Sequence, residues 1–96
     1  MTMSVGILTI QIILPGCLSL KEKRSRLKPL LFRLHREFNI SAAEIDFQDQ
    51  WQQAIIACTV VSNQKIFNQQ VLQKVTGFIE THFNDMQILN QEIELL

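Results

Sequence analysis

The chain of 96 residues has little glycine or proline, with three residues of the first and two of the second. Hydrophobic residues make up 47% of it and charged residues 19%. This composition is typical of a globular protein and argues against a disordered or fibrous chain. A chain of this length can build a two-layer core but not a second folded unit, so we expect a single domain over residues 1–96.

Cysteine is also scarce, which argues against a disulfide framework. Cys17 falls in a predicted loop and Cys58 in an apolar strand pattern, and neither has a CxxC or Cys/His spacing. We therefore expect two free thiols, no metal and no cofactor. A Ser/His/Asp or Cys/His arrangement is missing as well, so we predict that the protein is not an enzyme.

The chain has no apolar run of the length that a membrane span requires. The stretch "VGILTIQIIL" is interrupted by Thr9 and Gln11 and stops at Pro15, well short of about 20 apolar residues. The N-terminus lacks the basic region and the small-residue cleavage site of a signal peptide. We expect a cytoplasmic protein without a membrane partner.

The first two elements are a strand and a long helix. β-Branched residues over 4–13, followed by Pro15 and Gly16, predict a strand that ends in a turn. Ser19 and Glu22 have the spacing of a capping box and predict a helix that begins at Leu20. Pro29 projects away from the apolar stripe of this helix, so we expect one bent helix. The stripe consists of Leu20, Leu27, Leu30, Leu31, Leu34 and Phe38.

The rest of the chain predicts strands over 39–47, 51–62 and 86–96, with a helix capped by Ser62 or Asn63 between the last two. The order β-α-β-β-α-β predicts an α+β, ferredoxin-like fold, a four-stranded antiparallel sheet with two helices on one face. Strand 51–62 is apolar on both sides, which indicates a central position. On the second helix the predicted apolar face comprises Phe67, Val71, Leu72, Val75, Phe78, Ile79 and Phe83.

Alternation along the strands predicts which side chains face the helices. We expect these to be Leu8, Ile10, Ile12, Ile45, Phe47, Ile56, Cys58 and Val60. The opposite face then shows Ile7, Thr9, Gln11, Glu44, Asp46, Ile55, Ala57, Thr59 and Val61. In strand 86–96, Leu89 and Ile93 alternate against Ile88.

The open sheet face has no aromatic residue on its central strands, which disfavours the base stacking of RNA-recognition motifs. Ile7, Ile55 and Val61 instead suit a protein partner or a homo-oligomer. The acidic residues Glu44 and Asp46 favour a charged edge strand over a cation site.

Two further side chains are candidates for ligand contact. Trp51, at the start of a central strand, is expected to fill the core rather than to stack on a ligand. His82 lies on the apolar face of the second helix, close to its end, and is expected to cap that helix or to be a satisfied core residue.

Three segments make the chain resemble the YlxP-like bacterial family, a group whose domain has no known function. They are "LPGCLSLKEKRSRLKPLLFRL", "FNISAAEIDFQDQWQQAIIACTVVSN" and "VLQKVTGFIE", which together span nearly the whole sequence. The resemblance implies a ferredoxin-like fold and a small cytoplasmic protein, often encoded near translation and ribosome-maturation genes. The family commonly has histidine where this chain has Leu18 and Phe47, so chemistry at such histidines does not carry over.

Most of the positive charge is concentrated in the first helix. Between Lys21 and Glu37 stand seven basic and two acidic residues, although the formal net charge of the chain is zero. We predict that this helix contacts the phosphate backbone of RNA or a ribosome. The candidate nucleic-acid or anion-binding residues are Lys21, Lys23, Arg24, Arg26, Lys28, Arg33 and Arg36.

Lys21, Arg24 and Lys28 form one stripe of this helix, which His35 continues, while Arg26 and Arg33 line its other flank. A solvated charged surface is the alternative interpretation, with partners bound through the sheet instead. Small-anion binding at the loop before the helix, at Gly16 to Leu18, is a third possibility.

Overall fold

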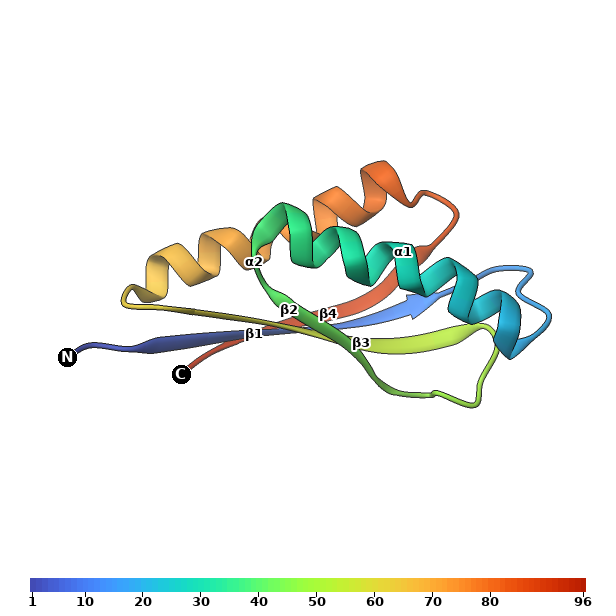
Figure 1. Ribbon diagram of the computed structural model, residues 1–96, viewed down its shortest axis with the longest axis horizontal. Helices are drawn as coiled ribbons and strands as arrows, with labels where there is room; N and C mark the ends of the chain where they lie inside the picture. Colours follow the sequence, from blue (N-terminus) through green and yellow to red (C-terminus); the bar gives the residue numbers. More distant parts are fainter.

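The computed structural model describes all residues 1–96. The elements follow in the order β1 (Ser4–Ile13), α1 (Leu20–Phe38), β2 (Ser41–Asp46), β3 (Gln53–Ser62), α2 (Lys65–His82) and β4 (Gln87–Leu95). The strands form one antiparallel sheet in the order β2-β3-β1-β4, and both helices cover the same face of it (Figure 1). The predicted ferredoxin-like α+β fold is confirmed, as is the central place of β3.

A capping residue at each end determines where helix α1 begins and ends. Ser19 is the N-cap residue, and its hydroxyl accepts a hydrogen bond from the backbone N–H of Glu22 at 3.0 Å, as the capping-box spacing predicts. Asn39 ends the helix in the left-handed region, with φ of 51°. Pro29 lies inside the helix on its exposed side, and the prediction of a single helix rather than two is confirmed.

Strict alternation in β1 and β3 builds the core. Leu8 and Ile10 of β1 pair with Cys58 and Ile56 of β3, and all four side chains are fully buried under the helices. Helix α2 approaches β1 at Gly6, where an added Cβ would lie 2.9 Å from the Leu72 Cδ1. Glycine at this position therefore permits the close packing of α2 on the sheet.

The predicted facing of β2 is wrong for Glu44, Ile45 and Phe47, whereas Asp46 pairs with Ile55 of the open face as expected. Ala42 and Glu44 lie on the helix side, whereas Ile45 is half exposed and Phe47 lies beyond the strand with φ of 59°. A bulge causes the difference, because Glu44 pairs with Ile56 and Asp46 with Ile55, leaving Ile45 without a partner. Glu44 therefore points towards α1 and not onto the open sheet face.

A second bulge changes β4. Asn90 pairs with Gln11 and Ile88 with Ile12, so that Leu89 has no partner on β1. Ile88 and Ile93 consequently both pack against the core, and Leu89 is 62% exposed. The prediction that Leu89 and Ile93 share a face against Ile88 is wrong for this reason.

Helix α2 begins later than predicted. Its N-cap residue is Gln64, which makes no side-chain cap, while the hydroxyl of Ser62 bonds to Asn68 Oδ1 at 2.7 Å and accepts from the Gln64 N–H. Phe67 is half exposed and does not belong to the buried face. Leu72, Val75 and Ile79 do, as expected.

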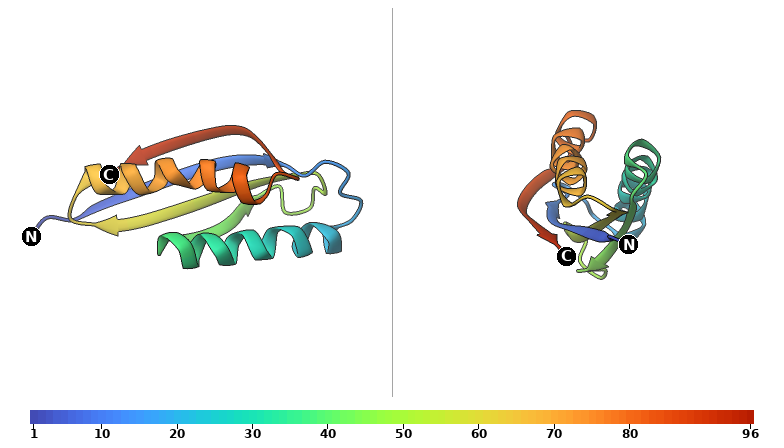
Figure 2. Two further views of the ribbon diagram at one scale, coloured as in Figure 1. Left: turned by 90° about the horizontal axis from the view of Figure 1, so that it is seen from above. Right: turned by 90° about the vertical axis from the view of Figure 1, so that its left-hand side faces the viewer.

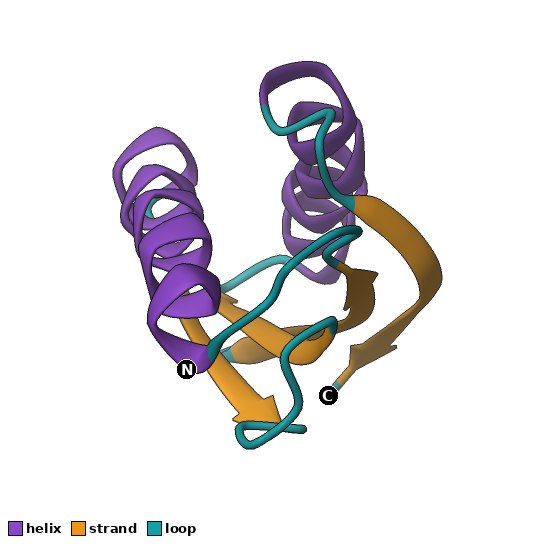
Figure 3. Ribbon diagram, turned by 90° about the vertical axis from the view of Figure 1, so that its right-hand side faces the viewer, coloured by secondary structure: helices purple, strands orange, loops and turns teal.

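Both helices run along the length of the strands (Figure 2), and neither is long and apolar enough to cross a membrane. The chain ends meet at one end of the sheet, where the backbones of Val5 and Leu96 exchange hydrogen bonds. The loops β1–α1, β2–β3 and α2–β4 gather at the opposite end, which faces the viewer in Figure 3.

Candidate polyanion-binding surface

The structure divides the seven basic side chains of α1 into a held group and a free group. Lys23 is the most firmly held, because it is only 1% exposed and lies in the buried stripe with Leu27 and Leu34. Its Nζ lies 2.7 Å from the Glu44 Oε2 and donates a hydrogen bond of 2.7 Å to the Phe47 carbonyl. Lys23 cannot reach a ligand, so its inclusion among the anion-binding residues is wrong.

Arg26 joins two loops at one end of the molecule. Its guanidinium donates to the carbonyl of Pro15 at 3.1 Å and to that of Asp85 at 2.9 Å. The carboxylate of Asp85 lies 3.2 Å from it, and that of Glu22 lies 3.8 Å away. The Arg26 side chain is only 17% exposed, and its contacts connect the β1–α1 loop to the α2–β4 loop.

Arg33 is engaged with α2. Its guanidinium lies 4.9 Å from the centre of the Phe78 ring and 5.8 Å from that of Phe83, and it approaches the Glu37 carboxylate at 3.7 Å. Arg36 also approaches Glu37, at 3.5 Å, but remains 61% exposed beside the exposed ring of Phe32. Both arginines therefore have at least one carboxylate neighbour.

Lys21, Arg24 and Lys28 form the free group, which we call the cationic stripe. All three are exposed, and none has a carboxylate within 4.0 Å. They lie on the flank of α1 next to β2, where Arg24 and Lys28 line a groove together with Leu27, Leu31 and Glu44. Glu44 forms its ion pair with Lys23 and none with a residue of the stripe.

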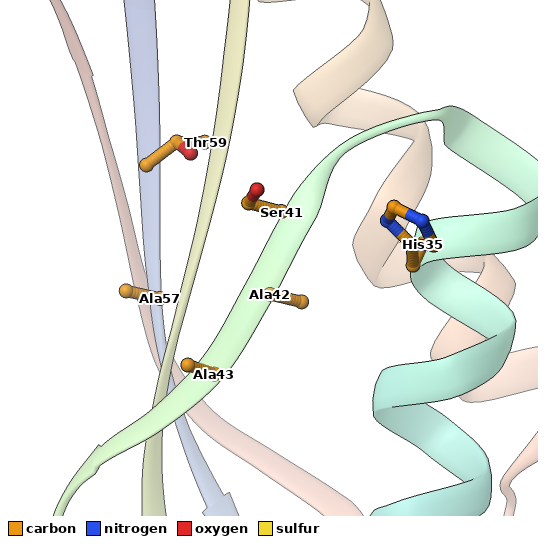
Figure 4. Close-up of a pocket in the computed structure, with 6 residues that line it drawn as sticks. All are labelled: His35, Ser41, Ala42, Ala43, Ala57 and Thr59. Carbon is orange, nitrogen blue, oxygen red and sulfur yellow. The ribbon is translucent and has the colours of Figure 1, made fainter.

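The edge strand β2 lies beside this flank. Small side chains leave a shallow depression there, and Figure 4 shows Ala42 on the α1 side of β2, where His35 lies, with Ser41 and Ala43 on the other side. The Nδ1–H of His35 donates to the Ile40 carbonyl at 2.8 Å, and its ring stays exposed. His35 therefore extends the stripe as an exposed ring tied to the start of β2.

Trp51 does not fill the core, contrary to the prediction. It is 50% exposed in the β2–β3 loop, in a shallow site lined by Asp49, Gln50, Gln52 and Gln53. The prediction places Trp51 at the start of the central strand, but β3 begins at Gln53, so Trp51 lies in the preceding loop.

The remaining titratable candidates are accounted for within the fold. Burial raises the pKa of the Cys58 thiol to about 12, and Cys17 is buried as well. His82 is exposed, stacks on Phe78 with ring centres 4.3 Å apart, and bonds through Nδ1 to the Phe78 carbonyl at 3.1 Å. No group of three or more His, Cys, Asp or Glu side chains is placed to hold a metal ion.

The open sheet face has the mixed character that the sequence predicts on β1 and β3. Ile7 and Ile55 are half buried there, and Val61 is 64% exposed. Glu92 and Glu94 of the edge strand β4 pair with Thr9 and Ile7 and add negative charge to this face. No aromatic side chain lies on its central strands.

The fold places the chain among ferredoxin-like α+β proteins. It superposes on the de novo designed protein Foldit4 with a TM-score of 0.56 at 11% identity, covering 97% of this chain and 96% of the other. The de novo designed protein LFR1 1, with ferredoxin fold, gives a TM-score of 0.55 at 12% identity, over 100% and 84% of the two chains. These likenesses establish the fold alone.

Sequence comparison gives the family. Residues 5–93 match the family described as "Protein of unknown function (DUF503)", and the chain belongs to it. It is also 36% identical over 77 residues to the "Uncharacterized protein YlxP" of Bacillus subtilis (strain 168), over 80% of this chain and 84% of that protein. The family resemblance drawn from the sequence motifs is thereby confirmed.

Proposed function

We propose that this protein is a non-enzymatic RNA- or ribosome-associated protein that contacts a phosphate backbone through the cationic stripe of Lys21, Arg24 and Lys28. The observation that carries the proposal is the sorting of the basic residues. Lys23 and Arg26 are used inside the molecule, and Arg33 and Arg36 have a carboxylate neighbour, but the three stripe cations have none.

The geometry of the stripe suits a nucleic-acid backbone. Lys21 and Lys28 are seven residues apart on α1, which is about 10 Å at a rise of 1.5 Å per residue. Along one strand of a helical nucleic acid that length holds about three phosphates. A contact of this kind neutralises phosphates without reading sequence, so the proposal is for a backbone contact of modest affinity.

A second candidate function is protein interaction through the open sheet face or the β2 edge, including self-association. The exposed aliphatic side chain of Val61 on this face favours it. The acidic Glu92 and Glu94 disfavour a symmetric contact of this face with itself, because like charges would approach each other. We therefore rank this candidate second.

Charge reversal tests the proposal. Anisotropy of a labelled single-stranded RNA should show binding by the natural protein and a loss of at least about tenfold in Arg24→Glu/Lys28→Glu. Lys65→Glu/Lys74→Glu is the matched control, because it changes the net charge equally at two exposed positions of α2. Equal losses in both variants would indicate a general charge effect and would contradict the proposal.

A variant of the sheet face distinguishes RNA binding from the second candidate function. Val61→Lys should leave RNA binding unchanged, since Val61 lies on the sheet face away from α1. A different result would make the sheet face the functional surface. In that case the natural protein does not bind RNA, and Val61→Lys dissociates an oligomer that sedimentation detects in the natural protein.

A further inference from the structure

The β2–β3 loop presents the only tryptophan of the chain at the end of the molecule where α1 begins. Trp51 is 50% exposed, and its neighbours in the shallow site are three glutamine side chains and Asp49. An indole half open to solvent within a small domain is a large apolar surface without a partner. Amide groups beside it can donate and accept hydrogen bonds.

Three hydrogen bonds fix this loop to α1 and to the β1–α1 loop. At one end, the carbonyl of Phe47 accepts a hydrogen bond of 2.7 Å from the buried Lys23 Nζ. At the other end, the Gln52 side chain donates to the Cys17 carbonyl at 3.3 Å, and the Gln52 carbonyl accepts from the Leu14 N–H at 2.9 Å. Trp51 is therefore held next to the β1–α1 loop, which leads into the turn that carries Lys21.

An exposed aromatic side chain thus lies at the same end of the molecule as Lys21, where the cationic stripe begins. Proteins that bind single-stranded nucleic acid combine these two features, because the cations follow the backbone while bases stack on the aromatic ring. The combination was absent from the sheet face, where no aromatic side chain lies on the central strands.

We propose that Trp51 stacks on a base of a single-stranded RNA whose backbone lies along Lys21, Arg24 and Lys28. This inference rests on the proposed function and adds the ligand class, because a stacking contact requires unpaired bases and excludes a fully double-stranded ligand. Protein partners that bury Trp51 are the competing outcome of the test.

The test uses the natural protein with short oligoadenylate and with inorganic polyphosphate, which supplies the charges without bases. Trp51→Ala should bind oligoadenylate about tenfold more weakly and polyphosphate with unchanged affinity. Trp51→Phe should restore most of the oligoadenylate affinity. Phe67→Ala is the matched control, since Phe67 is 48% exposed on α2, and it should have no effect.

A second readout is independent of affinity. Tyrosine is absent and tryptophan occurs once, so the intrinsic emission of the protein reports on Trp51 alone. Oligoadenylate should quench this emission, and polyphosphate should leave it unchanged.

The outcomes distinguish the two proposals. Oligoadenylate binding that neither quenches the emission nor weakens in Trp51→Ala overturns the stacking role and leaves the backbone contact standing. If the natural protein binds neither probe, both proposals fail. If Trp51→Ala loses a protein partner while oligoadenylate binding stays intact, Trp51 belongs to a protein interface and the stacking role is also overturned.

Discussion

The ammonium group of Lys23 lies 2.7 Å from the carboxylate of Glu44, beneath the surface between α1 and β2. The same ammonium donates to the carbonyl of Phe47, just past the end of β2. The Lys23 side chain thus binds both the edge strand β2 and the start of the loop that carries Trp51. Because it is buried in these contacts, it is not part of the basic surface.

Breaking this pair should destabilise the fold. Glu44→Gln leaves a buried ammonium without a counter-charge and should lower the free energy of unfolding by about 3 kcal/mol. Lys23→Met should cost less, about 2 kcal/mol, because the Glu44 side chain is 21% exposed and can recover some hydration. Denaturant unfolding at neutral pH measures both.

The double variant Lys23→Met/Glu44→Gln shows whether the two groups act together. Because neither charge remains in it, its cost should fall short of the sum of the single costs by about 1 kcal/mol or more. Strict additivity would mean that the two charges do not interact in the folded protein.

Arg26 should matter for stability and not for RNA binding. Arg26→Ala removes the hydrogen bonds to the Pro15 and Asp85 carbonyls and should cost about 2 kcal/mol. Arg36→Ala is the control, because its side chain is 61% exposed and its loss should change stability by no more than about 0.5 kcal/mol. A reduced RNA affinity in Arg26→Ala at a temperature where it is folded would return Arg26 to the binding surface.

Because the Cys58 thiol is buried, we expect the free energy of unfolding to fall at alkaline pH. Burial raises the pKa of its thiol from 9.0 to about 12, so the thiol is neutral in the folded protein where the unfolded chain already ionises. The contribution of the neutral thiol to the free energy of unfolding is complete below pH 9.0 and is lost as the pH rises towards about 12. The loss amounts to about 1.4 kcal/mol per pH unit in this window. Urea unfolding of the natural protein and Cys58→Ala across this window should give curves that converge.

Local patterns predict the fold where each strand alternates without interruption. The burial of Leu8 and Cys58 follows from their positions in β1 and β3, and the Ser19 cap follows from its spacing to Glu22. The facing of β2 and β4 could not be predicted, because single-residue bulges at Ile45 and Leu89 reverse it and have no signature in the alternating pattern.

The site was predictable in part. Helical spacing places Lys21 and Arg24 on one flank and Arg26 on the other, as the structure has them. A signal for Lys23 was present, since it stands four residues before Leu27 and therefore on the buried side of the helix. The sequence contains no signal for the partner of Lys23, because Glu44 comes close to Lys23 only through the tertiary packing of β2 against α1.

The salt dependence of RNA binding tests the central claim most directly. If only Lys21, Arg24 and Lys28 neutralise phosphates, the logarithm of the binding constant should fall against the logarithm of salt concentration with a slope of about −2 for a single strand. All seven basic residues of α1 acting together would give a slope of about −5, and a contact without counterion release would give a slope of about zero. Either of these two values would contradict the account.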